Sequence, residues 1–410
     1  MADRGISVVH FTNSVARGGV EEHILTLLGG LDRRQFRLQF VCTPDVAEQM
    51  RPDLPSDVTL YPLHFRKPSA ALSALRLMRI LRQCRADILH SHLFYSSLFA
   101  SPVGRACGVP VILETPHLRE EWRKGRFKSK FVVDRAVGRL VDRYIAVSEA
   151  NAQYLSEVKR LPKKKITVVR NGADLSKFSP AKFNPAQLDT AGGVTDELKK
   201  ALGFRETDPV LLAIARLEPQ KGHRILLEAL SGLRCEFPSV RLVCLGDGQL
   251  RLELERIVRD RGLSENVRFV GFQKNVCDWL ALADISVLSS FYEGLPLAAI
   301  ESLAAGKPVV ATAVDGTPEV VIDRKTGLIV PAGDPARLAG AILDLLRDPE
   351  RARTFGNSGR RWVLENFTQE RQIAETQALY LRMIRERSAY GEPALNLPGI
   401  EDREKEPACK

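Results

Sequence analysis

The sequence predicts an α/β protein built from two doubly wound parallel sheets, and three observations support this prediction. Short apolar runs alternate with helical stretches from the N-terminus to residue 172. The alternation stops between residues 173 and 208, and a second series of the same kind begins at residue 209. Parallel strands need a crossover connection, usually a helix, and this requirement produces such an alternation. A chain of 410 residues has room for two cores of this type.

The first series opens with the apolar run ISVVHFT at 6–12, which we expect to be a buried strand. The amphipathic stretch VEEHILTLLGGL at 20–31 follows it and predicts a helix. Period and β-branched content predict the remaining elements. They are a helix at 73–85 and strands at 36–43, 86–92, 109–117, 143–148 and 166–172. We assign residues 1–172 to an N-terminal domain.

The stretch 173–208 contains prolines, two adjacent glycines and no sustained period, so we expect it to be the interdomain linker. A second domain is predicted over 209–367. A last helix near 368–388 is expected to return to the first domain, and the polar, proline-containing tail at 389–410 is expected to be disordered. The second series comprises helices at 223–237 and 249–263 and strands at 209–217, 240–248, 267–272, 285–290, 307–313 and 326–331.

The positive charge is concentrated in the first half of the chain. Residues 1–180 hold 29 Lys and Arg against 17 Asp and Glu, whereas the remainder holds 31 against 33. A basic domain attracts anionic substrates or an anionic membrane surface. The same excess is also compatible with solubility alone. A nucleic-acid-binding module would need an aromatic platform or a known motif, and the sequence has neither.

Apolar runs and cysteine spacing limit the cellular context. No run approaches the roughly 18 residues that span a bilayer, and the N-terminus lacks the apolar segment of a signal peptide. We therefore expect a cytoplasmic protein. If its basic surface contacts the membrane, it lies at the inner face. The seven cysteines show no Cys-x-x-Cys or zinc-type spacing, so reduced thiols are expected.

The most informative stretch is FYEGLPLAAIESLAAGKPVVATAVDGT at 291–317. Glu293 and Glu301 have seven residues between them, and the intervening run predicts a helix that begins near Pro296 and ends at Gly306. The first amides of such a helix and its dipole favour an anion. Carboxylates beside an anion site suit a ligand that also carries hydroxyl groups, such as a nucleotide-sugar.

This motif resembles the two glutamates separated by seven residues in retaining glycosyltransferases of family 4, which have the GT-B fold. The resemblance implies two Rossmann-like domains that face a central cleft, with the donor held by the C-terminal domain. It implies that Glu293 contacts the sugar ring and that Glu301 bonds the ribose hydroxyls. Other donor contacts are expected from the same loop and helix, namely from Gly294, Leu295, Leu297 and Ala298.

A second match is the run AIARLEPQKG at 213–222. It resembles the segment that opens the C-terminal domain in this family, where Arg216 and Lys221 would clamp the diphosphate. Two cations can stabilise the leaving group without a metal ion. The chain contains no Asp-x-Asp, so we expect no metal site and no cofactor.

Further candidates lie at expected strand ends, where open α/β sheets bind ligands. Gly18 and Gly19 resemble the family's Gly-Gly-x-Glu loop facing the donor phosphate, although a simple tight turn is an alternative. His117 resembles a histidine that bonds a sugar hydroxyl and aligns the reacting carbon. Gly246 would allow close backbone approach. Phe272 would either cover the base or pack in the core.

The acceptor side is expected in the first domain. His90 and His92 project to one face of a strand and are interpreted as structural or acceptor-side residues. His-x-His can bind a metal ion, but no third ligand is evident nearby. Arg119 and Trp122 begin a loop with six cations and two aromatics, which is either a mobile acceptor loop or a membrane contact. The helical stretch 65–85 is either an ordinary helix with a solvated basic face or part of the same membrane contact.

The resemblance therefore implies transfer of a sugar from a nucleotide-diphosphate sugar, with UDP favoured, to a hydroxyl of a glycan or lipid-linked acceptor. A role in cell-envelope or exopolysaccharide synthesis, including lipopolysaccharide, is the expectation. The alternatives are a nucleotide-sugar 2-epimerase of the same fold, which would need its own acid and base, and a phosphorylase with a lysine that anchors pyridoxal phosphate.

Overall fold

A computed structural model describes residues 5–15, 17–64, 70–117, 119–120, 131–178 and 193–389 of the chain. The chain folds into two compact units. The first comprises Met1–Glu114, Ala136–Arg143 and Ala374–Lys410, and the second comprises Thr115–Arg135 and Tyr144–Ile373. Trp122 and all but the first residue of the predicted tail lie outside the described residues.

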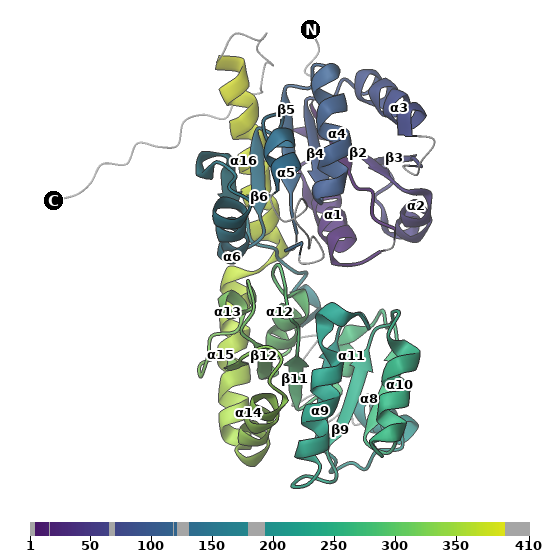
Figure 1. The fold of residues 1–410 in the computed structure, drawn as a ribbon, viewed down its shortest axis with the longest axis vertical. Helices are drawn as coiled ribbons and strands as arrows, with labels where there is room; N and C mark the ends of the chain where they lie inside the picture. The colour runs from purple at the N-terminus through teal and green to yellow at the C-terminus, as the bar shows by residue number, and fades with distance from the viewer. Residues whose placement is uncertain are drawn as a thin grey trace, which may run out of the picture. The chain divides into compact units, whose positions relative to one another are not determined.

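The first sheet has seven strands in the order β3-β2-β1-β4-β5-β6-β7. Strands β2 to β6 of this sheet are labelled in Figure 1. Its inner strand β1 is buried at all six positions, as expected for a parallel sheet covered on both faces. β1 pairs in parallel with β4, which places His10 opposite His90. The strands are β1 Ile6–Phe11, β2 Phe36–Cys42, β3 Thr59–Pro62, β4 Ile88–His92, β5 Val111–Thr115, β6 Arg143–Ala146 and β7 Ile166–Val168.

Helices and short helical turns connect these strands, as the alternating pattern predicts. The α-helices are α1 Gly19–Gly30, α2 Pro44–Met50, α3 Ala70–Gln83, α4 Phe94–Ala106, α5 Val132–Val137 and α6 Glu149–Gln153. The shorter turns are η1 Arg51–Asp53, η3 Tyr154–Val158, η4 Lys163–Lys165 and η5 Ser176–Phe178. Strand β3, whose four residues are half-buried or exposed, has no counterpart among the sequence-based predictions.

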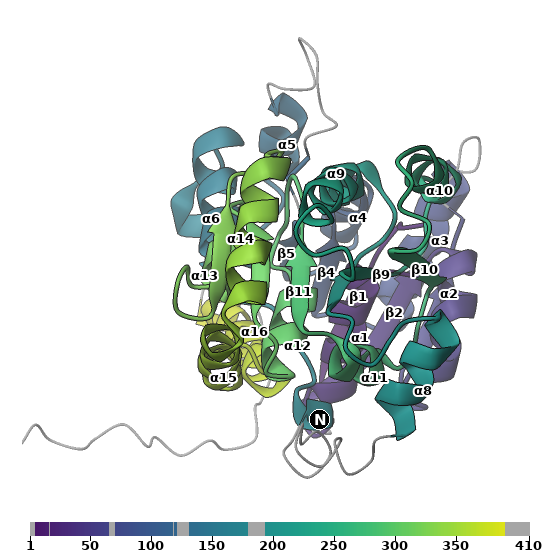
Figure 2. The ribbon, with the colours of Figure 1, turned by 90° about the horizontal axis from the view of Figure 1, so that it is seen from below.

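The second sheet has six strands in the order β10-β9-β8-β11-β12-β13. Alternate residues of each strand enter two separate cores: Leu212 packs on one face of the sheet and Leu211 on the other. Helices α11, α12 and α15 cover the first face, and α9, α10 and α14 cover the second (Figure 2). The strands are β8 Val210–Ile214, β9 Arg241–Leu245, β10 Val267–Gly271, β11 Ile285–Leu288, β12 Val309–Thr312 and β13 Gly327–Val330.

The helices around the second sheet are α9 His223–Leu233, α10 Arg251–Asp260, α11 Val276–Leu282, α12 Leu297–Ala304, α13 Thr317–Val320, α14 Pro335–Arg347 and α15 Pro349–Asn366, with a short turn η6 at Pro219–Lys221. Helix α16, Gln369–Ala389, confirms the helix predicted near 368–388. The two parallel sheets with their helices confirm the predicted α/β class.

One helix occupies the stretch in which the sequence shows no sustained period. Helix α8, Gly193–Leu202, contains Leu198 and Leu202, which pack against the core of the second sheet. Two leucines four residues apart in a polar segment are too few to mark a helix by periodicity.

Among the described residues, no helix combines the length and the apolar character that crossing a bilayer requires.

Candidate active site

The helix predicted between the two glutamates is present as α12, Leu297–Ala304, with Pro296 at its N-cap. Glu293 lies in the loop before the helix, and Glu301 is its fifth residue and therefore lies in the second turn. The first amides of α12 have no acceptor within the helix, which leaves donors for an anion at this end. Gly306 follows the helix with a φ of 73°, the left-handed conformation that ends helices.

Glu293 is a buried residue held by three contacts, two to its carboxylate and one to its backbone N–H. Its Oε1 accepts hydrogen bonds from Lys221 Nζ at 2.6 Å and from Ser290 Oγ at 2.7 Å. Its backbone N–H donates to Asp315 Oδ2 at 2.9 Å. Asp315 has a φ of 41°, in the left-handed region that Asp adopts more readily than most non-glycine residues. The structure thus brings together Glu293, Lys221 and Asp315, which are far apart in the sequence.

The loop that carries Lys221 is fixed tightly against the end of β11. Gly222 has a φ of 65°, and a Cβ there would lie 2.0 Å from the carbonyl oxygen of Ser289. Ser289 Oγ also donates to the Lys221 carbonyl at 2.9 Å. Only glycine allows this approach, so the loop delivers the Lys221 ammonium to Glu293 from a rigid base.

Arg216 differs from Lys221 because its side chain has no partner among the described residues. It is exposed at the end of β8, and its guanidinium makes no hydrogen bond or ion pair with any residue that the structure describes. A guanidinium has five N–H donors in a planar fork that matches phosphate oxygens. Arg216 is therefore available for an anion, whereas Lys221 is already engaged with Glu293.

At Gly246 the predicted close backbone approach is to another backbone segment of the same chain. A Cβ on Gly246 would lie 2.1 Å from the carbonyl oxygen of Ala215, and one on Gly248 would lie 2.7 Å from that of Leu217. Both glycines have positive φ values, 129° and 157°. They let the chain after β9 pack against the backbone on either side of Arg216, and this packing explains why glycine is needed here.

Phe272 follows β10 and is 73% exposed, which rules out the alternative that it packs in the core. An exposed aromatic ring at a strand end is suited to stacking on a nucleobase.

The second glutamate, Glu301, also forms an ion pair. Lys177 Nζ donates to Glu301 Oε1 at 2.7 Å, although the two residues are 124 positions apart in the chain. No sequence signal pointed to Lys177, since a lysine in a predicted linker is ordinarily a solvated surface residue.

His117 and Arg119 lie in the same unit as the glutamates. His117 is buried directly after β5, and its carbonyl oxygen would lie 2.0 Å from a Cβ added to Gly294. Gly294 therefore has to be glycine. Arg119 Nε is 2.5 Å from Asp315 Oδ1, so Arg119 supports the residue that holds the Glu293 backbone.

Gly18 and Gly19 lie at the start of α1 in the first unit. A Cβ on Gly19 would meet no atom within 4 Å, so packing does not require glycine there. The turn is held by Glu21, which is buried and accepts a hydrogen bond from the Gly18 N–H at 2.9 Å.

His92 belongs to a buried histidine cluster. His10, His90 and His92 are all fully buried, and one ligand atom from each lies within 4.8 Å of the others. His10 Nδ1 is 3.1 Å from His92 Nε2, and His90 Nδ1 is 2.6 Å from the Tyr380 hydroxyl. Sequence reasoning found no third histidine near His90 and His92. It missed His10, which the pairing of β1 with β4 brings beside them.

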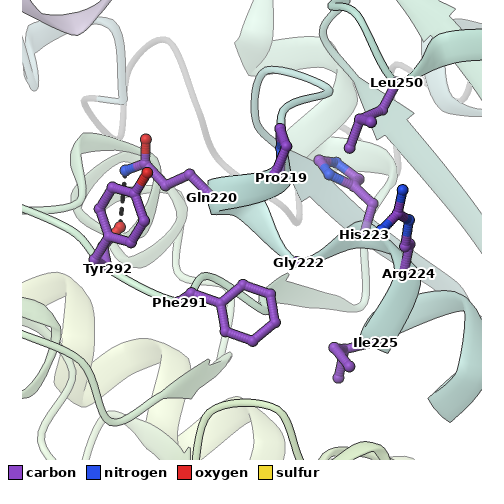
Figure 3. Close-up of a pocket in the computed structure, with 9 residues that line it drawn as sticks. All are labelled: Pro219, Gln220, Gly222, His223, Arg224, Ile225, Leu250, Phe291 and Tyr292. Atoms are coloured by element: carbon purple, nitrogen blue, oxygen red, sulfur yellow. Dashed lines mark hydrogen bonds between the residues drawn. The ribbon is translucent and has the colours of Figure 1, made fainter. Parts of the chain in front are cut away.

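A cavity of about 690 Å³ borders the loops that carry Lys221 and Glu293 (Figure 3). Gln220 Nε2 donates to the Tyr292 carbonyl at 2.8 Å and ties the two loops together. His223 lines the cavity but is 2% exposed, and neither ring nitrogen has a hydrogen-bond partner in the described part of the chain. Burial, followed by the positive charge of Lys221, lowers the pKa of His223 to about 4.

Two family models match the chain in succession. "Glycosyltransferase Family 4" matches residues 17–177, and "Glycosyl transferases group 1" matches residues 194–362. Among solved structures, Anabaena HepE in complex with UDP-glucose superimposes with a TM-score of 0.75 at 19% identity, over 91% of this chain and all of that one.

Curated relatives are similar over different spans. The putative glycosyltransferase EpsD of Bacillus subtilis is 35% identical over 45% of this chain, which spans about half of that relative (48%). The alpha-maltose-1-phosphate synthase of Mycolicibacterium smegmatis is 30% identical over 73% of this chain and 79% of its own length. The UDP-Gal:alpha-D-GlcNAc-diphosphoundecaprenol alpha-1,3-galactosyltransferase of Escherichia coli is 24% identical over 76% of this chain and 79% of its own length.

The two parallel sheets and the matched models place the chain among the glycosyltransferases with the GT-B fold. The chain belongs to glycosyltransferase family 4.

Proposed function

We propose that this enzyme transfers a sugar from a nucleotide-diphosphate sugar to a hydroxyl of a glycan or lipid-linked glycan, with retention of the anomeric configuration and without a metal ion. The observation that supports this most is the group formed by Glu293, Lys221 and the N-terminus of α12, with the guanidinium of Arg216, unpaired among the described residues, on the neighbouring strand end.

In this proposal the diphosphate is bound by Arg216, by Lys221 and by the first amides of α12. Each supplies positive charge where the leaving group gains negative charge. Glu301 accepts hydrogen bonds from the ribose, and Phe272 stacks on the base. UDP is favoured because it is the nucleotide bound in HepE.

The reaction is a front-face substitution. The bond between the anomeric carbon and the β-phosphate oxygen breaks, and the acceptor oxygen bonds to that carbon on the same face. The departing phosphate takes the acceptor proton, so no separate general base is assigned. Glu293 is not offered as a nucleophile, because front-face substitution needs no covalent intermediate. It orients the sugar hydroxyls, and His117 helps to align the reacting carbon.

The acceptor proposal rests on the basic first half of the chain and on the E. coli relative, whose name gives a lipid-diphosphate acceptor. Helix α3 adds a surface suited to an anionic membrane. Leu72 and Leu75 are each 61% exposed, and Arg76, Arg79 and Arg82 are exposed beside and beyond them. Apolar anchors combined with cations are the features of interfacial helices. The proposed setting is cell-envelope or exopolysaccharide synthesis at the inner face of the membrane.

Membrane contact is tested by sedimentation with vesicles of phosphatidylglycerol and of phosphatidylcholine. We expect binding to phosphatidylglycerol only, and we expect the double change Leu72→Ser and Leu75→Ser to reduce it. Equal binding of the double variant would remove α3 from the proposal.

The donor is identified by thermal shift with UDP-, GDP- and ADP-sugars, since a ligand that binds the folded state raises the melting temperature. The stabilising donor is then incubated with candidate lipid-linked glycans, and the anomeric configuration of the product is read by NMR. An inverted product contradicts the retaining mechanism. Release of an epimerised free sugar without any acceptor supports the 2-epimerase alternative.

A further inference from the structure

The ion pair between Lys177 and Glu301 joins the proposed ribose carboxylate to a distant segment of the chain. Lys177 Nζ donates to Glu301 Oε1 at 2.7 Å, and the Glu301 side chain is 18% exposed. Glu301 makes no other side-chain hydrogen bond or ion pair with the residues that the structure describes. Its second oxygen is therefore available to a ligand.

The segment that carries Lys177 is anchored on both sides of the lysine. The Ala173 N–H donates to the Phe367 carbonyl at 3.0 Å, and the Gln369 N–H donates to the Ala173 carbonyl at 3.0 Å. The Gly172 N–H donates to Gln372 Oε1 at 2.6 Å. These bonds tie the segment to the beginning of α16.

On the other side of the lysine, Phe178 is fully buried in the core of the second sheet, and its carbonyl accepts a hydrogen bond from Arg360. Asp174 Oδ1 accepts hydrogen bonds from the Ser176 N–H at 3.0 Å and from Ser176 Oγ at 2.6 Å, which closes the turn before Lys177. The ammonium is therefore presented from a fixed backbone, and its pairing with Glu301 loses less conformational entropy than a pair between two mobile surface side chains.

The charge of Lys177 supports a stable ion pair with Glu301. Burial alone would lower the pKa of Lys177, but attraction to Glu301 and the hydrogen bond with it outweigh burial and raise that pKa above its usual value. The lysine therefore remains charged throughout the physiological pH range.

We infer that Lys177 is a positioning residue of the donor site, which holds Glu301 by one oxygen so that the other faces the ribose hydroxyls. This inference rests on the proposed function, because it takes Glu301 as the ribose ligand. A carboxylate fixed in one rotamer accepts a hydroxyl pair without first paying the entropy of ordering.

The test is a comparison of UDP with 2′,3′-dideoxy-UDP, which lacks both ribose hydroxyls, by calorimetry on the full chain. Hydrogen bonds to a charged group are stronger than those between neutral groups, so the wild type should prefer UDP by at least about tenfold. In Lys177→Met this preference should fall severalfold, while the affinity for the dideoxy compound stays constant. Lys177→Arg should restore most of the preference. In transfer assays Lys177→Met should raise KM for the donor and leave kcat nearly unchanged.

Lys325→Met is the matched control, because Lys325 is an exposed lysine of the same unit. An unchanged preference in Lys177→Met overturns the inference while the ribose role of Glu301 stands. A higher preference also overturns it, because Lys177 would then compete with the ribose. An equal loss in Lys325→Met shows a general charge effect and overturns it as well.

A wild type that binds UDP and dideoxy-UDP equally contradicts the ribose role of Glu301 itself. A wild type that binds no nucleotide contradicts the proposed donor. GDP replaces UDP in both arms if the thermal-shift screen selects guanosine.

Discussion

The two sheets differ in the burial and charge of the polar side chains at their strand ends. At the ends of β1 and β4, the rings of His10 and His92 are fully buried and hydrogen-bonded to each other. Burial, followed by the charge of His23, lowers the pKa of His10 to about 3, so its ring stays neutral. At the ends of β8 and β11 the groups are charged, as in the pair of Lys221 and Glu293. Neutral buried rings carry no charge to offer a ligand, whereas the charged groups at the ends of β8 and β11 can form charge-assisted hydrogen bonds with one.

The largest effect should come from the cations of the second unit. Arg216→Ala is the cleanest change, because the Arg216 side chain has no hydrogen bond or ion pair in the described part of the chain and its removal leaves no group there unpaired. We expect kcat to fall by about a hundredfold, as for the loss of one electrostatic donor at a leaving group. Arg324→Ala, at an arginine whose side chain is 80% exposed, is the control and should keep full activity. Unchanged kcat in Arg216→Ala would contradict the assignment.

Lys221→Ala sharpens the same comparison, because it removes a cation and also leaves the buried Glu293 without its partner. We expect a similar loss of kcat together with a lower melting temperature, since breaking a buried pair strands a charge. Loss of stability with normal kcat at low temperature would assign Lys221 a structural role only.

A smaller effect is expected at the second glutamate. Glu301→Ala removes the proposed ribose acceptor and should weaken nucleotide binding by about tenfold, in proportion to one or two charge-assisted hydrogen bonds. Calorimetry with the matching nucleoside diphosphate measures this change. Glu265→Ala, at an exposed glutamate, is the control. Equal affinities in the two variants would show that Glu301 does not contact the nucleotide.

The sequence predicted some features of this site but not others. The buried strands and helix α12 were predictable because apolar period, Pro296 and Gly306 act locally, whereas the half-exposed strand β3 was not. The pairing of Lys221 with Glu293 was not, because it depends on β8 lying next to β11 in the sheet. Strand order is a tertiary property that no local pattern records. His10 was missed for the same reason, since only the β1–β4 register places it opposite His90.

Lys177 illustrates a further limit. Its partner lies 124 residues away, and its position depends on the anchoring of residues 172 and 173 to the start of α16. Gly246 shows the reverse case, in which a glycine expected to face a ligand is required by the Ala215 carbonyl. Packing of the backbone therefore determines where glycine is required in this region.

The buried histidines should make stability depend on pH. His223 titrates at a pKa of about 4 in the folded chain against an ordinary value of 6.5. The unfolded chain therefore binds more protons between these values, and stability falls as the pH is lowered from 6.5 towards 4, by up to about 1.4 kcal/mol per pH unit for one histidine. His223→Leu should reduce the drop in urea midpoint between pH 7 and pH 5, because leucine needs no proton and leaves no ring nitrogen unpaired. His64→Gln, at an exposed histidine, should not. An unaltered drop in His223→Leu would contradict this source of acid sensitivity.

The smallest expected effect is that of a chelator. The proposed site neutralises the diphosphate with Arg216, Lys221 and the amides of α12, and the chain has no Asp-x-Asp to hold a divalent ion on the phosphates. Transfer measured with EDTA present should thus proceed at nearly the untreated rate, and added Mg²⁺ or Mn²⁺ should not raise it. Loss of activity in EDTA that Mg²⁺ restores would mean that a metal shares the charge assigned to the two cations. In that case Arg216→Ala should also cost less than the hundredfold expected above, because the ion and the guanidinium would stabilise the same phosphate oxygens.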